Sequence, residues 1–243
     1  MSNIYEALEL ASGKKTGGGI TPELALQTEV TRGVSLSTEM SWLHHRVEAL
    51  LANSANKMIQ FMGSKRGEGV STIVREFAKV AVERHGKSVL ILDSAYQDPT
   101  RRININVTCE YGWLDLLKEG ELIDKAFYRV GDSTLYFAPI SVQASMLPPV
   151  KDLNLESNVW DKLKEKFDLI LIDSSSDTNS TESITVSRNV DGVVLIVEAE
   201  KTNKKSIKKI KDRVIANGGN IIGVILNKRK YYIPEYFYKK FIE

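Results

Sequence analysis

Six continuous apolar runs, separated by stretches of helical periodicity, constrain the fold of this chain more than any other feature. The runs are MIQFMG at 58, SVLILD at 88, TLYFA at 134, DLILID at 168, GVVLIVE at 192 and IIGVIL at 221. Helical patterns lie between them near 71–85, 111–127, 156–166, 180–189 and 202–217. Unbroken Val, Ile and Leu runs indicate strands covered on both faces, and intervening helices indicate parallel crossovers. The pattern predicts an α/β fold: a doubly wound, mostly parallel sheet with helices on both faces.

The length and composition fit one globular domain with extensions. The chain has 243 residues, of which 42% are hydrophobic and 26% charged, and its net charge is +2. So small a charge does not imply a polyanionic partner for the chain as a whole. The single cysteine, Cys109, cannot form an internal disulfide, and no apolar run approaches the roughly 18 residues of a spanning helix. We therefore expect a cytoplasmic protein.

Three segments are expected along the chain. Residues 1–12 have the pattern of a short helix, residues 13–36 contain Gly17 to Gly19 and Pro22 and predict a flexible linker, and residues 37–243 form the main domain. Because an isolated helix of this length is only marginally stable in water, we expect it to dock either on its own domain or on a partner. The main domain begins with an amphipathic helix whose apolar side is expected to hold Met40, Leu43, Val47, Leu50 and Leu51.

The loop FMGSKRGEGVST, at 61–72, has the composition of a phosphate-binding loop. Gly67 and Gly69 allow backbone amides to approach one centre, and the helix that starts behind them points its positive end at the same spot. Ser71 or Thr72 would offer a hydroxyl to Mg²⁺. Two glycines before a helix are also compatible with a simple tight turn.

Two aspartates strengthen the prediction of a nucleotide site. Asp93 closes one buried strand and Asp173 closes another. Either carboxylate alone could cap the following helix. Because ligands of doubly wound sheets lie at the carboxyl ends of the strands, both aspartates and the glycine loop together predict a magnesium-nucleotide pocket.

The order of these motifs resembles that of one known family. The loop is followed by ILDSAYQDP, FDLILIDSSSD, VDGVVLIVEAEKT and IIGVILNKRKYYIPEYFYKKF. This order is similar to that of the cytoplasmic domains of bacterial tyrosine kinases, which control capsule and exopolysaccharide synthesis and belong with the partitioning ATPases in the deviant P-loop group. The opening MSNIYEALELA also resembles the start of stand-alone members encoded with exopolysaccharide export systems.

The resemblance carries expectations about fold, ligands and partners. It implies a P-loop NTPase fold over residues 37–243, with ATP or ADP and Mg²⁺ as ligands if the site is competent. It implies a membrane-embedded polysaccharide co-polymerase or export protein as partner, and copies of the chain itself as a further partner. A peripheral position at the inner membrane would follow from that partner. Nucleic acid is not expected, because no recognised nucleic-acid module is present.

The resemblance also assigns site residues. Matches to the phosphate loop are Gly67, Glu68, Gly69, Ser71 and Thr72. Asp93 matches a carboxylate of the kinases' second motif, and Asp173 matches the carboxylate that, with Ser71, holds the Mg²⁺ shell. Asn227 falls where relatives use an asparagine to read adenine.

Two positions depart from the family pattern. Val70 stands where the kinases carry the lysine that neutralises the phosphates, and Ala95 stands where they carry a second carboxylate. Losing a charge-assisted phosphate contact costs on the order of 1.5 to 3 kcal/mol in binding. A missing transition-state cation can cost roughly 10³ or more in rate. These losses predict a pseudo-kinase that binds nucleotide weakly or not at all and acts through a partner.

Two alternatives remain open. The first is an active tyrosine autokinase or ATPase in which Lys65 or Arg66 replaces the lost lysine, although a solvated charge at the loop mouth explains either residue. The second is a partitioning-type ATPase that dimerises on nucleotide. The segments YYIPEYF and YEALELA favour the polysaccharide group over this second alternative.

Two further features have two interpretations each, and a third concerns metal binding. The tail places four tyrosines close together, which either pack or accept phosphate from a partner kinase: Tyr231, Tyr232, Tyr236 and Tyr238. The lysine-rich segment 201–213 is either a solvated helix face or a contact for anionic lipid or an acidic partner. His44 and His45 are adjacent on a helix and His85 is expected elsewhere, so no zinc site is predicted.

Overall fold

The computed structural model describes residues 23–24, 36–54, 56–94, 109, 111–113, 123–139, 157–174 and 181–229. Within them one eight-stranded sheet has the order β1-β4-β5-β3-β6-β2-β7-β8. The strands are β1 (Glu23–Leu24), β2 (Lys57–Gly63), β3 (Val89–Asp93), β4 (Tyr128–Val130), β5 (Leu135–Ala138), β6 (Leu169–Asp173), β7 (Gly192–Glu198) and β8 (Ile221–Asn227). Neighbouring strands are parallel except β4 and β5.

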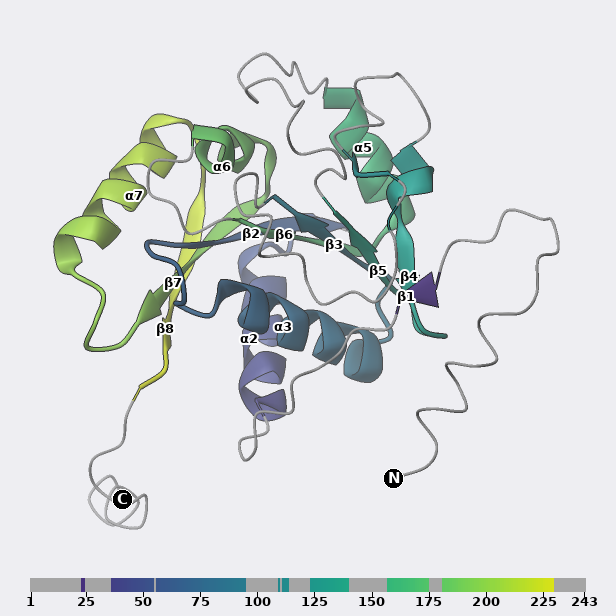
Figure 1. Cartoon of the computed structure of the whole chain (residues 1–243), viewed down its shortest axis with the longest axis horizontal. Coiled ribbons are helices and arrows are strands. Elements are labelled where there is room, and N and C mark those ends of the chain that lie inside the picture. The colour runs from purple at the N-terminus through teal and green to yellow at the C-terminus, as the bar shows by residue number, and fades with distance from the viewer. Residues whose placement is uncertain are drawn as a thin grey trace, which may run out of the picture.

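Helices cover both faces of this sheet (Figure 1). On one face lie α2 (Ser37–Leu50) and α3 (Val70–His85), and on the other lie α5 (Ser157–Lys166), α6 (Thr181–Val186) and α7 (Lys204–Ala216). Short 3-10 turns are η2 (Ile123–Ala126) and η5 (Ser187–Asn189). The predicted doubly wound α/β fold is confirmed, and each of the six predicted strands is present within one residue of its expected position. None of the described helices is both long and apolar enough to cross a membrane.

Two separate apolar cores follow from the alternation of side chains along the strands. Met58 and Met62 of β2 join the core beneath α5, α6 and α7. Ile59 and Phe61 of the same strand join the core with α2 and α3. A strand buried on both faces therefore needs a continuous apolar run, which is the feature from which the fold was predicted.

The strands that the sequence pattern did not predict are the short ones at one sheet edge. β1 and β4 have two and three residues, too few to show a periodicity. β1 lies inside the range 13–36 that was expected as a linker, and pairs with β4 in register Glu23 with Arg129. The helix expected for residues 1–12, and most of the linker, lie outside the described residues.

The first helix differs from its prediction at two positions. Met40, Val47 and Leu51 are buried as expected, but Leu50 is 59% exposed. His44 is buried in its place, because it lies one turn from Met40 and one turn from Val47, nearer the centre of the buried stripe.

The expectation that His85 lies apart from the other histidines is wrong. The imidazole rings of His44 and His85 stack with centroids 3.8 Å apart and an interplanar angle of 2°, and His45 stands edge-on to both. Helix α3 brings its last residue alongside α2, which no local pattern could indicate. Burial, followed by repulsion from His85, lowers the pKa of His44 to about 4.

Candidate nucleotide site

The phosphate loop, residues 64–69, joins the carboxyl end of β2 to the first residue of α3. Gly67 and Gly69 adopt φ of +88° and +93°, a region that side chains other than glycine rarely occupy. A Cβ added at Gly69 would lie 2.3 Å from Nδ2 of Asn227, so this position also needs glycine for space. The amides of the first turn of α3 have no partner within the helix, so the loop and helix end form an anion-binding arrangement.

Glu68 organises the loop from inside. Its side chain is 1% exposed, and its carboxylate accepts hydrogen bonds from the Ser64 backbone amide, the Ser64 hydroxyl at 2.7 Å and the Lys65 amide at 3.0 Å. A fourth donor is the Thr202 hydroxyl, 2.5 Å from Oε1, which comes from the connection between β7 and α7. Four donors on one buried carboxylate hold the loop in a single shape and tie it to a distant segment.

Two residues at the end of β8 donate hydrogen bonds to the backbone of the same loop. The Asn227 side-chain amide donates to the Glu68 carbonyl at 2.7 Å, and the Lys228 ammonium donates to the Gly67 carbonyl. Lys228 also lies 3.7 Å from Glu198, whose pKa is lowered by the hydrogen bond from Lys201. The family resemblance implies that Asn227 reads adenine, and in this structure its side chain contacts the loop backbone.

Val70 occupies the position at which the family resemblance leads us to expect a lysine. It is the first residue of α3, is 1% exposed and packs in the apolar core shared by α2, α3 and the sheet. Valine here contributes to the apolar core and brings no charge to the loop. Lys65 and Arg66 are exposed on the loop, and the Lys228 ammonium also lies against it at the Gly67 carbonyl.

The two predicted aspartates lie side by side at the carboxyl edge of the sheet. Asp93 of β3 and Asp173 of β6 are register partners on neighbouring strands. Asp173 is 6% exposed, and its carbonyl accepts hydrogen bonds of 3.0 Å from both the amide and the hydroxyl of Ser94. The indole of Trp113 donates to the Asp93 carbonyl at 2.9 Å. Both strand ends are therefore held by hydrogen bonds to their backbones.

A buried polar chain that sequence reasoning missed lies beside these aspartates. Gln60, in the middle of β2, donates to the Ser174 hydroxyl at 2.6 Å and to the Ser183 carbonyl at 2.8 Å. The hydroxyls of Ser174 and Ser94 are 3.0 Å apart. The signal in the sequence is an isolated glutamine inside the apolar run MIQFM. Thr202 and Lys228 were also missed, and only their adjacency to strand ends hints at them.

Of the other predicted site residues, some lie within the part of the chain that the structure describes and some lie outside it. Ser71 and Thr72 lie in the first turn of α3, half-buried and exposed respectively. Ala95 and the four tail tyrosines lie outside the described residues.

The residues present fit a magnesium nucleotide in part. The glycine conformations and helix end suit phosphate, and the Ser71 hydroxyl and Asp173 carboxylate are oxygen ligands of the type that Mg²⁺ prefers. The cation that would complete phosphate binding is absent from position 70. The site therefore has the backbone arrangement that suits phosphate, with an uncharged side chain at position 70.

Known proteins of two kinds share this arrangement of elements. The chain is 25% identical over 206 residues to the putative tyrosine-protein kinase CapB of Staphylococcus aureus, covering 83% of this chain and 84% of CapB. The crystal structure of the chimerical protein CapA2B2 superposes with a TM-score of 0.70 at 22% identity, covering 87% of this chain and 95% of that one.

A division-site protein with bound nucleotide is also similar. The septum site-determining protein MinD of Pyrococcus horikoshii OT3, in complex with Mg-ADP, gives a TM-score of 0.53 at 22% identity, over 74% of this chain and 75% of that one. These likenesses show a P-loop NTPase fold. The family model described as cellulose biosynthesis protein BcsQ matches residues 56–214, more than half of the sequence. The chain therefore belongs to the BcsQ family and resembles the bacterial tyrosine kinases predicted from its motifs.

Proposed function

We propose that this chain is a regulatory or assembly component of capsule or exopolysaccharide biosynthesis, acting by partner binding, with weak or no ATP turnover. The relatives' names support the pathway, because they include a cellulose biosynthesis family and a putative capsule-type tyrosine-protein kinase. The observation that supports reduced turnover is the burial of Val70 in the apolar core, at the position that the family resemblance assigns to the phosphate lysine. A valine there gives a transferring phosphoryl group no electrostatic stabilisation.

Nucleotide binding would use the parts of the site that remain. The backbone amides around Gly67 and Gly69 and the first turn of α3 would contact the phosphates, with Ser71 and Asp173 holding Mg²⁺. Asp93 would lie at the same edge of the sheet, and Asn227 beside the base. A bound ATP would supply the phosphoryl group, and this chain would orient it without a lysine at position 70.

The first experiment measures turnover. Purified chain incubated with labelled ATP and Mg²⁺ should give neither phosphotyrosine nor released phosphate above a no-enzyme control. The double variant Val70→Lys/Ala95→Asp restores both missing groups and should raise phosphate release by about tenfold or more. Robust turnover by the unaltered chain would overturn the proposal.

An active autokinase or ATPase is the second candidate, favoured by the exposure of Lys65 and Arg66 on the phosphate loop. Turnover by the unaltered chain that Lys65→Ala or Arg66→Ala abolishes would establish it. The tail tyrosines Tyr231, Tyr232, Tyr236 and Tyr238 would then be the acceptors sought by mass spectrometry. Nucleotide-dependent dimerisation on a sizing column would instead favour a partitioning-type ATPase.

The partner is tested separately. We expect a membrane-embedded co-polymerase or export protein, encoded near polysaccharide genes, to retain this chain at the inner membrane. Cross-linking in cells followed by membrane fractionation should recover the pair, and deleting the partner should reduce the membrane fraction. Equal recovery without the partner would contradict this part of the proposal.

A further inference from the structure

Helix α7 presents a dense array of positive charge to solvent. Its lysine face consists of five exposed side chains: Lys204, Lys205, Lys208, Lys209 and Lys211. Asp212 is the one acidic residue in the helix. The array runs along a helix about 20 Å long. The protein as a whole carries a net charge of only +2, so this concentration of charge is local.

The lysine face is held outward by the fold. Ile210 and Val214, on the opposite side of α7, are 4% and 0% exposed and pack in the core beneath the sheet. Asn203 caps the helix, because its side-chain oxygen accepts a hydrogen bond of 2.6 Å from the Lys205 amide. The helix therefore cannot rotate to bury its charges without exposing that core.

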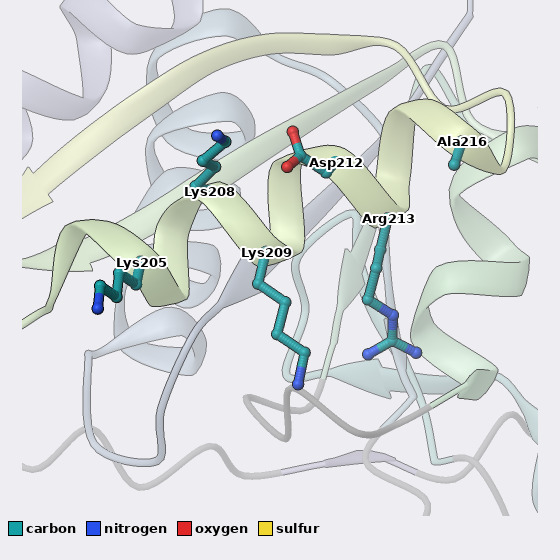
Figure 2. A pocket seen from close by; sticks show the side chains of 6 residues that line it. All are labelled: Lys205, Lys208, Lys209, Asp212, Arg213 and Ala216. Carbon is teal, nitrogen blue, oxygen red and sulfur yellow. The ribbon is translucent and has the colours of Figure 1, made fainter.

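The lysine stems and an exposed isoleucine make this surface partly apolar. Figure 2 shows Lys208 and Asp212 to one side of α7 and Lys209 and Arg213 to the other. With Lys205 and Ala216 they line an open hollow of about 500 Å³. Ile215 is 54% exposed and lies one turn beyond Lys211 and two turns beyond Lys208, on the same arc of the helix.

We propose that the lysine face of α7, with Ile215, docks directly on a bilayer surface rich in anionic phospholipid. Lysines are compact, strongly hydrated charges that suit a diffuse array of head groups, whereas arginine is the side chain of choice for bidentate phosphate contacts. An exposed isoleucine among the lysines gains from the boundary between head groups and acyl chains, a gain that a nucleic-acid backbone does not offer. This contact goes beyond the proposed function, in which the membrane is reached through a partner protein.

The test uses the purified full chain without nucleotide or partner, so that its outcome is independent of turnover and of the proposed complex. The chain is sedimented with vesicles of phosphatidylglycerol and phosphatidylcholine, and with vesicles of phosphatidylcholine alone. We expect binding to the anionic vesicles only, and we expect added salt to weaken it. The variant Lys205→Glu/Lys208→Glu should lower the partition coefficient by about tenfold or more.

A matched variant separates the lysine face from net charge. Lys79 on α3 and Lys162 on α5 are exposed elsewhere, and Lys79→Glu/Lys162→Glu makes the same change in net charge. This control should keep vesicle binding within about twofold of the original. Ile215→Ser should weaken vesicle binding severalfold while leaving any binding to duplex DNA unchanged.

Four results would overturn the inference. They are no binding to anionic vesicles, equal binding to neutral vesicles, equal losses in the two double variants, and tighter binding to duplex DNA than to anionic vesicles. Circular dichroism of each variant verifies that it is folded before its binding is compared.

Discussion

The two ends of helix α3 carry buried polar clusters of opposite character. At the amino end, the Glu68 carboxylate accepts hydrogen bonds from four donors. At the carboxyl end, His85 stacks on His44, and the buried nitrogens His44 Nδ1 and His85 Nε2 have no hydrogen-bond partner among the described residues. A buried carboxylate whose hydrogen bonds are all made holds the loop in one conformation. A buried imidazole with an unpaired nitrogen destabilises the fold when it gains a proton, because its charge is then buried without a partner.

The comparison shows that the loop at residues 64–69 is held in shape by hydrogen bonds from several elements. The hydrogen bonds that shape the loop come from Glu68, Thr202, Asn227 and Lys228, whereas Val70, where the family resemblance leads us to expect a lysine, packs in the apolar core. The shape of the loop therefore depends on residues other than the one at position 70. Four experiments, in decreasing order of expected effect, test this contrast.

The largest effect is expected for Glu68→Ala. Removing the carboxylate leaves several buried donors unsatisfied, so the free energy of unfolding should fall by about 3 to 5 kcal/mol, measured by urea denaturation. Glu83→Ala, at an exposed glutamate of α3, is the control and should change the free energy of unfolding by less than about 0.5 kcal/mol. A loss below about 1 kcal/mol for Glu68→Ala would show that the loop does not depend on its carboxylate.

The histidine end should make stability depend on pH. The pKa of His44 is about 4 in the folded chain and near 6.5 when unfolded, so the unfolded state binds more protons between these values. The free energy of unfolding is therefore highest above pH 6.5 with respect to this group. It falls by about 3 kcal/mol in total as the pH drops toward 4. Besides the stacked ring, the charged groups that act on His44 are Glu48, Lys87 and His45.

His44→Phe tests this assignment, because it keeps an aromatic ring in the stack and removes the titration. Urea denaturation between pH 7 and pH 4 should show a much flatter loss of stability in this variant than in the original chain. His45→Gln, which changes an exposed ring, should keep most of the slope. An unchanged slope in His44→Phe would assign the pH dependence to other groups.

The contact between β8 and the loop should make Gly69 less tolerant than Gly67. Both have positive φ, but only at Gly69 would a Cβ meet another atom within 4 Å. We expect Gly69→Ala to cost about 2 to 3 kcal/mol and Gly67→Ala about 1 kcal/mol in thermal or urea unfolding. Asn227→Ala should recover part of the Gly69→Ala loss. Equal costs at the two glycines would argue against the close approach of Asn227.

The smallest effect is expected for Lys228→Met, because this lysine is half-exposed and its ion pair is screened by water. Stability should fall by less than about 1 kcal/mol, while hydrogen exchange of the amides in residues 64–69 should accelerate. Lys201→Met is the matched control, since Lys201 also pairs with Glu198 at 2.7 Å. Equally faster hydrogen exchange in both variants would assign the effect to Glu198. It would argue against a specific role for the hydrogen bond from Lys228 to the loop.

Much of the fold and part of the site were predictable, for identifiable reasons. A strand covered on both faces must be apolar along its whole length, so β2, β3, β5, β6 and β7 are visible as runs. For the sixth run, β8, the expectation of two covered faces is wrong, because it is an edge strand on which Val224 and Leu226 are 58% and 57% exposed. β1 and β4 lie at a sheet edge and are too short for a pattern. Leu50 was misplaced because helical periodicity alone does not distinguish the border of a buried stripe from its centre.

The sequence by itself determined the chemistry available at the site. Residue identity alone establishes the glycines of the loop, the aspartates at two strand ends and the valine at position 70. The tertiary structure alone decided which distant groups hold that loop. Thr202, Asn227 and Lys228 reach it because β7 and β8 follow β2 in the sheet order, and His85 meets His44 because α3 packs against α2. Local periodicity encodes which side of an element is buried, whereas the partner of a side chain depends on how elements far apart in the chain are arranged.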